Sequence, residues 1–213
     1  MFPERLTKGY RAFIQGRFAV ERGRYQQLAG QGQSPSIMVI GCVDSRVSPE
    51  VIFDAAPGEI LVARNVANLV PRYEPPGEED PSHQHGTSAA LEFAVRALKV
   101  RDIVVLGHAF CGGIKAFASD QAPLTASDFI GRWMAQIAPA AEAIAAPKDG
   151  GEDYLRELEF ASVELSLRNL MTFPFVQAAV EEGVLTLHGA YFGVASGKLL
   201  VRNDATGTFE PVG

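Results

Sequence analysis

Three short apolar segments, each separated from the next by a helical pattern, restrict the fold of this chain most strongly. They span residues 36–42, 59–65 and 101–108, and their runs of Val, Ile and Leu are typical of strands that are buried on both faces. The intervening residues 48–54 and 86–100 show helical features, including a proline just inside the start of the first. Strands that alternate with helices pair in parallel within one layered sheet. We therefore predict an α/β fold with a central, mostly parallel β-sheet flanked by helices.

Both ends of the chain extend this central unit. Residues 4–29 place apolar side chains at helical spacing, and the sequence GQGQSP at 30–35 ends that pattern. We predict that residues 1–35 form an N-terminal helical arm and that residues 36–213 form a single α/β domain. Within that domain, residues 183–203 show a strand, a Ser-Gly turn and a returning strand, which predicts a C-terminal antiparallel hairpin. Further predictions are a loop over residues 70–83 and helices over residues 126–145 and 153–171.

Charge and hydropathy exclude several classes of partner. The net charge is −6 without any basic run, which argues against nucleic acid. No apolar stretch approaches the roughly 20 residues that a membrane span needs. The N-terminal segment carries charges throughout, unlike a secretory signal, so we expect a cytoplasmic protein with neither a nucleic acid nor a membrane partner. In that reducing compartment, Cys42 and Cys111 are expected to be metal ligands or reactive thiols rather than a disulfide.

Reactive side chains gather at the ends of two predicted strands. Cys42, Asp44 and Arg46 occupy alternate positions where the first apolar segment ends, and alternate residues of an extended chain share a face. His108 ends the third apolar segment, and Cys111 follows three residues later. Because ligands of parallel sheets bind beyond the carboxyl ends of the strands, both groups are predicted to lie at one edge of the sheet.

This combination of side chains predicts a zinc site. Two thiolates and one imidazole are donors that suit Zn²⁺ in tetrahedral geometry, and the pattern uses both cysteines of the chain. Two alternatives remain: these are ordinary core residues, or Asp44 is a fourth ligand that closes a structural zinc site. Arg46 favours an open site, because a bidentate ion pair with Arg46 would keep Asp44 off the metal. Zn²⁺ in an open site would lower the pKa of a bound water, so we expect activity that rises with pH above neutrality.

Several motifs resemble those of the β-class carbonic anhydrases, in their plant-like branch. CVDSRV begins at Cys42 and HAFCGG begins at His108, while PGEILVARNVANLV, GTSAALEFAV and LHGAYFGVASGKL also resemble that branch. The likeness covers nearly the whole chain from Gln33 onward. The resemblance implies a zinc-dependent lyase that reversibly hydrates CO₂ to bicarbonate and a proton, by attack of zinc-bound hydroxide on CO₂.

The resemblance also implies roles for individual residues. It implies that the zinc ligands are Cys42, His108 and Cys111. It implies that Asp44 and Arg46 are the catalytic dyad, in which Asp44 orients the zinc-bound hydroxide. The substrate contacts that it implies come from Gln33, Leu61, Val66, Phe93 and the backbone N–H of Gly112.

The resemblance carries two further expectations. Val39 stands three residues before Cys42, where a bicarbonate-inhibited branch of the family has a tryptophan, which implies an open site with Asp44 paired to Arg46. The family's cleft lies at a dimer interface, which implies a homodimer or a dimer-based higher oligomer, with Gln33 supplied by the neighbouring subunit. Two alternative functions stay open: a hydrolase of carbon disulfide or carbonyl sulfide on the same scaffold, and a non-catalytic zinc protein with a closed four-ligand site.

Overall fold

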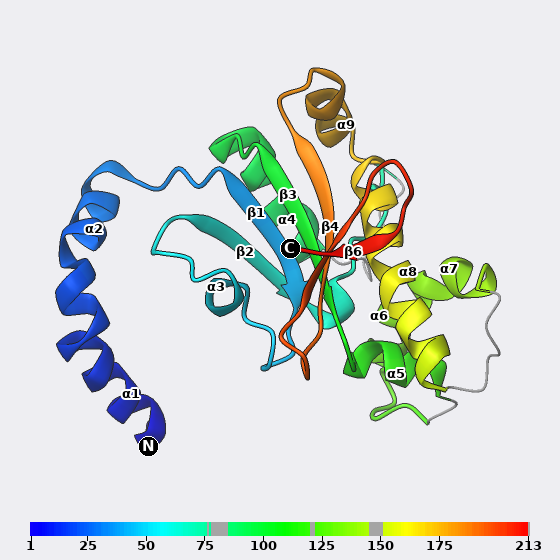
Figure 1. Ribbon diagram of the computed structural model, residues 1–213, viewed down its shortest axis with the longest axis horizontal. Coiled ribbons are helices and arrows are strands. Elements are labelled where there is room, and N and C mark those ends of the chain that lie inside the picture. Colours follow the sequence, from blue (N-terminus) through cyan, green and yellow to red (C-terminus); the bar gives the residue numbers. More distant parts are fainter. Residues whose placement is uncertain (76, 78–84, 120–121, 145–150, 213) are drawn as a thin grey trace.

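A mixed β-sheet lies at the centre of the molecule (Figure 1). The computed structural model describes residues 1–213 except 76, 78–84, 120–121, 145–150 and 213. In this described part, six strands follow the order β2-β1-β3-β4-β5-β6, with parallel pairing from β2 to β4 and antiparallel pairing from β4 to β6. The strands are β1 (Ile37–Cys42), β2 (Ile60–Asn65), β3 (Asp102–His108), β4 (Thr186–Phe192), β5 (Leu199–Arg202) and β6 (Phe209–Pro211).

Helices cover the sheet and also extend away from it. Helix α8 packs along β3 and β4, and α4 packs against β2. Two helices, α3 and α9, begin with a proline, at a position where the missing N–H has no helical partner to lose. The helices are α1 (Glu4–Gln15), α2 (Arg17–Gln31), α3 (Pro49–Ile52), α4 (His85–Glu92), α5 (Gly112–Ala118), α6 (Phe129–Met134), α7 (Ala138–Glu142), α8 (Glu152–Leu170) and α9 (Pro174–Glu181), with the 3₁₀ helices η1 (Val66–Asn68) and η3 (Ala135–Ile137) and the π-helix η2 (Phe93–Leu98).

The core is divided by the sheet because successive residues of a strand point to opposite faces. Met38 and Ile40 of β1 pack in one core cluster with residues of α4, α8 and α9, whereas Val39 packs with Leu106 on the other face. Fully burying side chains of this size contributes about 1.5 to 3 kcal/mol each. A further cluster surrounds the two cysteines and includes residues of α5, α7 and α8. The carboxyl ends of β1 and β3 are therefore held by packed core on both sides.

The predicted sheet and its C-terminal hairpin are confirmed, while one helical prediction needs correction and one helix was missed. The helix predicted over residues 126–145 is interrupted: α6 ends at Met134, and α7 begins at Ala138 after the turn η3. Pro139 lies in the first turn of α7, and a proline in a helix interior would remove a hydrogen bond. Helix α9 and strand β6 were not predicted. The loop predicted over residues 70–83 lies partly outside the described residues.

Helices α1 and α2 project from the body of the molecule (Figure 1). Neither contains a buried residue. Arg17 and Arg24 donate hydrogen bonds to the carbonyl oxygens of Ala55 and Pro57, each at 3.1 Å. Division of the chain at residue 35 stays a prediction. In the described part of the chain, no helix has the length and apolar character needed to cross a membrane.

Candidate metal centre

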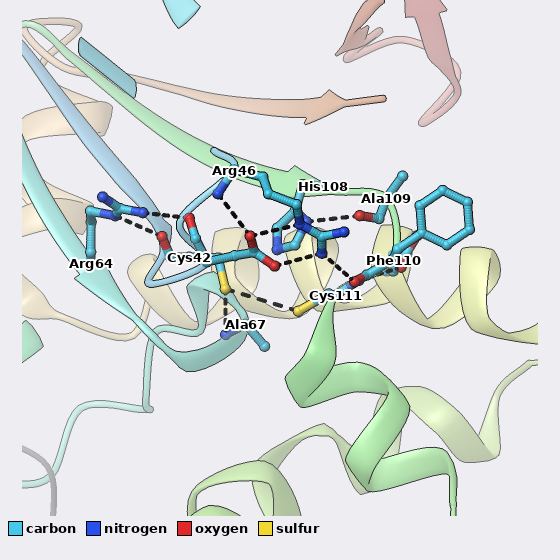
Figure 2. A network of polar contacts seen from close by, with 10 residues as sticks. Cys42, Arg46, Arg64, Ala67, His108, Ala109, Phe110 and Cys111 are labelled. Carbon is cyan, nitrogen blue, oxygen red and sulfur yellow. Dashed lines mark hydrogen bonds and ion pairs between the residues drawn. The ribbon is translucent and has the colours of Figure 1, made fainter. Parts of the chain in front are cut away.

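Parallel pairing brings the predicted ligands together at one edge of the sheet. Strands β1 and β3 are direct neighbours, with Gly41 beside Leu106, so Cys42 and His108 both lie at their carboxyl ends. Cys111 follows β3 directly before α5. The ligand atoms of Cys42, His108 and Cys111 lie within 4.8 Å of one another, and all three side chains are buried (Figure 2). The two Sγ atoms are 4.0 Å apart.

The imidazole of His108 is oriented for metal binding. Its Nδ1 lies 2.9 Å from the backbone oxygen of Ala109, and a carbonyl oxygen can only accept, so Nδ1 carries the proton. Nε2 is then left with a free lone pair. This nitrogen is buried and has no hydrogen-bond partner among the described residues. Metal-bound histidines commonly donate the other ring N–H to a carbonyl in this way, which fits the group to a soft cation such as Zn²⁺.

The two thiols ionise as a pair. The hydrogen bond with Cys111 lowers the pKa of Cys42, with a further contribution from the backbone N–H of Ala67, which donates to Cys42 Sγ at 3.4 Å. The same hydrogen bond, together with burial, raises the pKa of Cys111. Cys42 therefore gives up its proton more readily than Cys111, and a cation that binds both sulfurs as thiolates must displace the proton that remains.

Asp44 and Arg46 form an ion pair beside the ligands. The guanidinium donates to both carboxylate oxygens, at 3.0 Å and 2.7 Å, and the backbone N–H of Arg46 donates to Oδ1 at 2.9 Å. Hydrogen bonding from Arg46 holds the pKa of Asp44 well below its usual range. Arg46 also donates to the carbonyl oxygen of Phe110 at 3.0 Å, which ties the ion pair to the segment carrying Cys111 (Figure 2).

Two neighbouring features shape the backbone around Cys42. Arg64 donates to the carbonyl oxygens of Cys42 and Asp44 at 2.7 Å and 2.6 Å, so it holds the turn that follows β1. Ala67 adopts a left-handed backbone with φ of 62°, which directs its N–H at Cys42 Sγ. Trp133 donates its indole N–H to the carbonyl oxygen of Val66 at 2.7 Å and thus supports this turn. Sequence reasoning missed the role of Ala67, because an alanine carries no signal for a left-handed conformation.

Two of the predicted substrate contacts lie near the ligands. Gly112 is the first residue of α5, directly after Cys111. Val66 lies directly before Ala67 and packs closely on Gly113. A Cβ added at position 113 would lie 2.6 Å from Val66 Cγ1. Val66 also borders a groove of about 610 Å³ beside the turn after β1. Its other lining residues include Val43, Val62, Arg64, Ile130 and Trp133.

The other three predicted contacts lie elsewhere in this chain. Gln33 is exposed and precedes β1, so the six residues of that strand, about 20 Å, separate it from Cys42. Leu61 packs in the core cluster that contains Met38. Phe93 is about half exposed, and neither Leu61 nor Phe93 is among the described residues that line the groove. Contacts of these three residues with substrate stay predictions, and Gln33 would reach a site only on a second copy of the chain.

The fold and the site together define an α/β protein with a buried Cys–His–Cys group at the carboxyl edge of its sheet that could hold a metal ion. A family model described as carbonic anhydrase matches residues 37–199. The chain belongs to the carbonic anhydrase family and, within it, to the β class of these enzymes.

Individual relatives cover almost the full length of the chain. Beta carbonic anhydrase 3 of Arabidopsis thaliana is 35% identical over 198 residues, which are 91% of this chain and 74% of that protein. The solved structure of the β-carbonic anhydrase CcaA has a TM-score of 0.83 and 28% identity, covering 99% of this chain and 92% of the other. A β-carbonic anhydrase described as tetrameric, from Sordaria macrospora, has a TM-score of 0.76 and 27% identity, covering 92% and 94%.

Proposed function

We propose that this protein reversibly hydrates CO₂ to bicarbonate and a proton, with Zn²⁺ held by Cys42, His108 and Cys111. The observation that carries this proposal is the convergence of three buried donors, including the unpartnered Nε2 of His108, beside the Asp44–Arg46 ion pair. When bound, Zn²⁺ supplies Lewis acidity and lowers the pKa of a coordinated water, which makes a hydroxide nucleophile accessible near neutral pH.

Asp44 serves as an acceptor that orients the nucleophile. Arg46 engages both oxygens of the Asp44 carboxylate, which keeps that carboxylate ionised and directs it away from the three ligands. Asp44 would then not act as a further ligand to a metal held by Cys42, His108 and Cys111, and water could reach that metal. Asp44 accepts a hydrogen bond from the attacking oxygen, so that a lone pair of this oxygen faces CO₂. Arg46 holds the Asp44 carboxylate in position and balances its negative charge.

CO₂ binds in the groove that Val66 lines. CO₂ is small and apolar, and the groove beside Val66 is lined largely by apolar side chains. The backbone N–H of Gly112 faces the product bicarbonate, Leu61 and Phe93 contribute to the apolar walls, and Gln33 reaches the pocket from the neighbouring subunit. A rival on the same scaffold is hydrolysis of carbon disulfide or carbonyl sulfide. A comparison of the three substrates on one purified preparation separates these activities.

The pH profile of CO₂ hydration tests the open site. A carboxyl group with a lowered pKa is ionised at every pH above that value, so Asp44 does not titrate between roughly pH 6.5 and 9. We expect the stopped-flow hydration rate of zinc-loaded protein to rise across this range, because ionisation of the nucleophile controls it. Metal-free protein is the control. A rate that falls toward alkaline pH would contradict the open site, and absence of turnover at full zinc occupancy would favour the sulfur-containing substrates or a closed site.

The same proposal includes a dimer in which each arm packs on the other subunit. Helices α1 and α2 expose Leu6, Tyr10 and Val20, with 55%, 63% and 87% of each residue accessible. Among the described residues, the arm donates hydrogen bonds to Ala55 and Pro57 and packs against Gly58, and these exposed side chains are left for a partner. Such an arrangement accords with the tetrameric description of the Sordaria relative, since tetramers are commonly built from dimers.

Light scattering during size-exclusion chromatography tests the dimer. We expect a mass of at least twice 22.9 kDa for the unaltered protein. The double substitution Tyr10→Glu with Val20→Glu should shift it toward the monomer, because two charges would be placed in an apolar interface. Gln26→Glu, on an exposed position of the same arm, is the matched control and should leave the mass unchanged. A dimer that survives the double substitution would argue against the arm as its interface.

A further inference from the structure

A buried carboxylate lies next to the metal-binding group and contacts its backbone. Glu159, on α8, is only 5% exposed. Its Oε1 accepts the backbone N–H of Cys111 at 3.0 Å, and its Oε2 accepts the hydroxyl of Tyr191, on β4, at 2.6 Å. Tyr191 is likewise buried. Taking a carboxylate out of water is costly unless its oxygens are engaged, and here one of its two partners is the backbone of a proposed zinc ligand.

The peptide unit between Phe110 and Cys111 is held at both ends. Its carbonyl oxygen accepts a hydrogen bond from Arg46 at 3.0 Å, and its N–H donates to Glu159 at 3.0 Å. The plane of a peptide is rigid, so two hydrogen bonds on opposite sides fix its orientation. This orientation sets the direction in which the Cα–Cβ bond of Cys111 leaves the backbone. The hydrogen bonds thus run without interruption from Asp44 through Arg46 and the peptide to Glu159.

The conformation of Phe110 requires such support. Phe110 has a φ of 59°, in the left-handed region that non-glycine residues rarely adopt. Backbone of this kind persists only where the surroundings impose it. Its ring is not the cause, because Phe110 is 60% exposed and therefore weakly packed. Among the described residues, the side-chain hydrogen bonds to this peptide come from Arg46 and go to Glu159, and the N–H of the preceding Ala109 donates to the carbonyl oxygen of Phe192 at 3.0 Å.

We propose that Glu159 is a positioning residue for the metal centre, supported by Tyr191, and that it aims Cys111 Sγ at the metal by fixing the Phe110–Cys111 peptide. The proposal rests on the metal site proposed above. Glu159 itself touches neither metal nor substrate: it acts through the backbone of Cys111. The competing explanation is a purely structural pair that joins α8 to β4, and this would affect the stability of the fold alone.

Metal affinity and a spectroscopic signature distinguish the two explanations. Zn²⁺ affinity is measured by competition with a chelator, and Co²⁺-substituted protein reports sulfur coordination through its thiolate-to-metal charge-transfer and d–d bands. The variants are Glu159→Leu, Glu159→Gln and Tyr191→Phe. Glu164→Leu is the matched control, because Glu164 lies on the same helix but pairs with Arg202, away from the ligands. Thermal unfolding of the metal-free proteins measures the stability of each variant.

We expect Glu159→Leu to weaken Zn²⁺ binding 10- to 100-fold, the usual effect of losing a partner that orients a ligand, and to alter the Co²⁺ bands. Glu159→Gln keeps an oxygen for the Cys111 N–H and should stay within about threefold of the unaltered protein, with Tyr191→Phe in between. Glu164→Leu should keep both affinity and bands even where its unfolding temperature falls. Unchanged affinity and bands in Glu159→Leu would overturn the proposal. Failure of the unaltered protein to bind Zn²⁺ would instead overturn the proposed function.

Discussion

His108→Ala is expected to weaken zinc binding by about a hundredfold or more and, at limiting zinc, to lower CO₂ hydration with it. Structural zinc sites bind with roughly 10 to 16 kcal/mol, so the loss of one protein ligand costs about 3 to 5 kcal/mol. That corresponds to a loss of roughly a hundred- to several-thousand-fold in affinity. The alanine also removes the buried Nε2 that has no other partner among the described residues. Zinc content by atomic absorption and turnover by stopped flow are measured on the same preparation.

His188→Ala is the matched control for this experiment. His188 lies on the neighbouring strand β4, opposite Val104 and thus four residues before the end of β3, and it pairs with Asp102 at 2.9 Å. This variant should retain full zinc content and turnover. If His108→Ala kept its zinc with unaltered affinity, His108 would not be a ligand. In that case the Cys–His–Cys assignment would fail.

Asp44→Asn is expected to lower turnover by about 10²- to 10³-fold while zinc content stays near that of the unaltered protein. The substitution keeps the size of the side chain but removes the charge that Arg46 engages through two hydrogen bonds. Asparagine can present an N–H where the nucleophile needs an acceptor, so orientation of the attacking oxygen is lost. Asp44 is not part of the Cys42–His108–Cys111 group, and the metal should therefore remain.

Asp204→Asn provides the control for Asp44→Asn. Asp204 also accepts from an arginine, Arg202, at 2.9 Å, but in the exposed turn between β5 and β6. Its substitution should leave turnover unchanged. A loss of less than about threefold in Asp44→Asn at full zinc occupancy would remove Asp44 from the mechanism. A crystal structure near neutral pH with Asp44 coordinated to zinc would contradict the open site directly.

The sequence by itself determined the sheet and the identity of the clustered donors. Apolar strands alternating with helices can bury both faces of a sheet only by parallel pairing, and parallel strands place their carboxyl ends at one edge. Cys42 and His108 end two such strands, so their meeting follows from chain order alone. The two-residue spacing of Asp44 and Arg46 likewise predicts the local ion pair that the structure contains. These are short-range patterns, and their physical consequences need few distant contacts.

Tertiary structure decided the features that depend on distant partners. Glu159 looks like the other carboxylates of α8 in sequence, and only burial beside Cys111, 48 residues away, distinguishes it. Ala67 donates to Cys42 from a left-handed turn for which an alanine gives no signal. Gln33 lies one strand length from the ligands of its own chain, so a role for it depends on a second subunit. Such features arise from packing and hydrogen bonds between segments remote in sequence, which residue spacing along one chain does not encode.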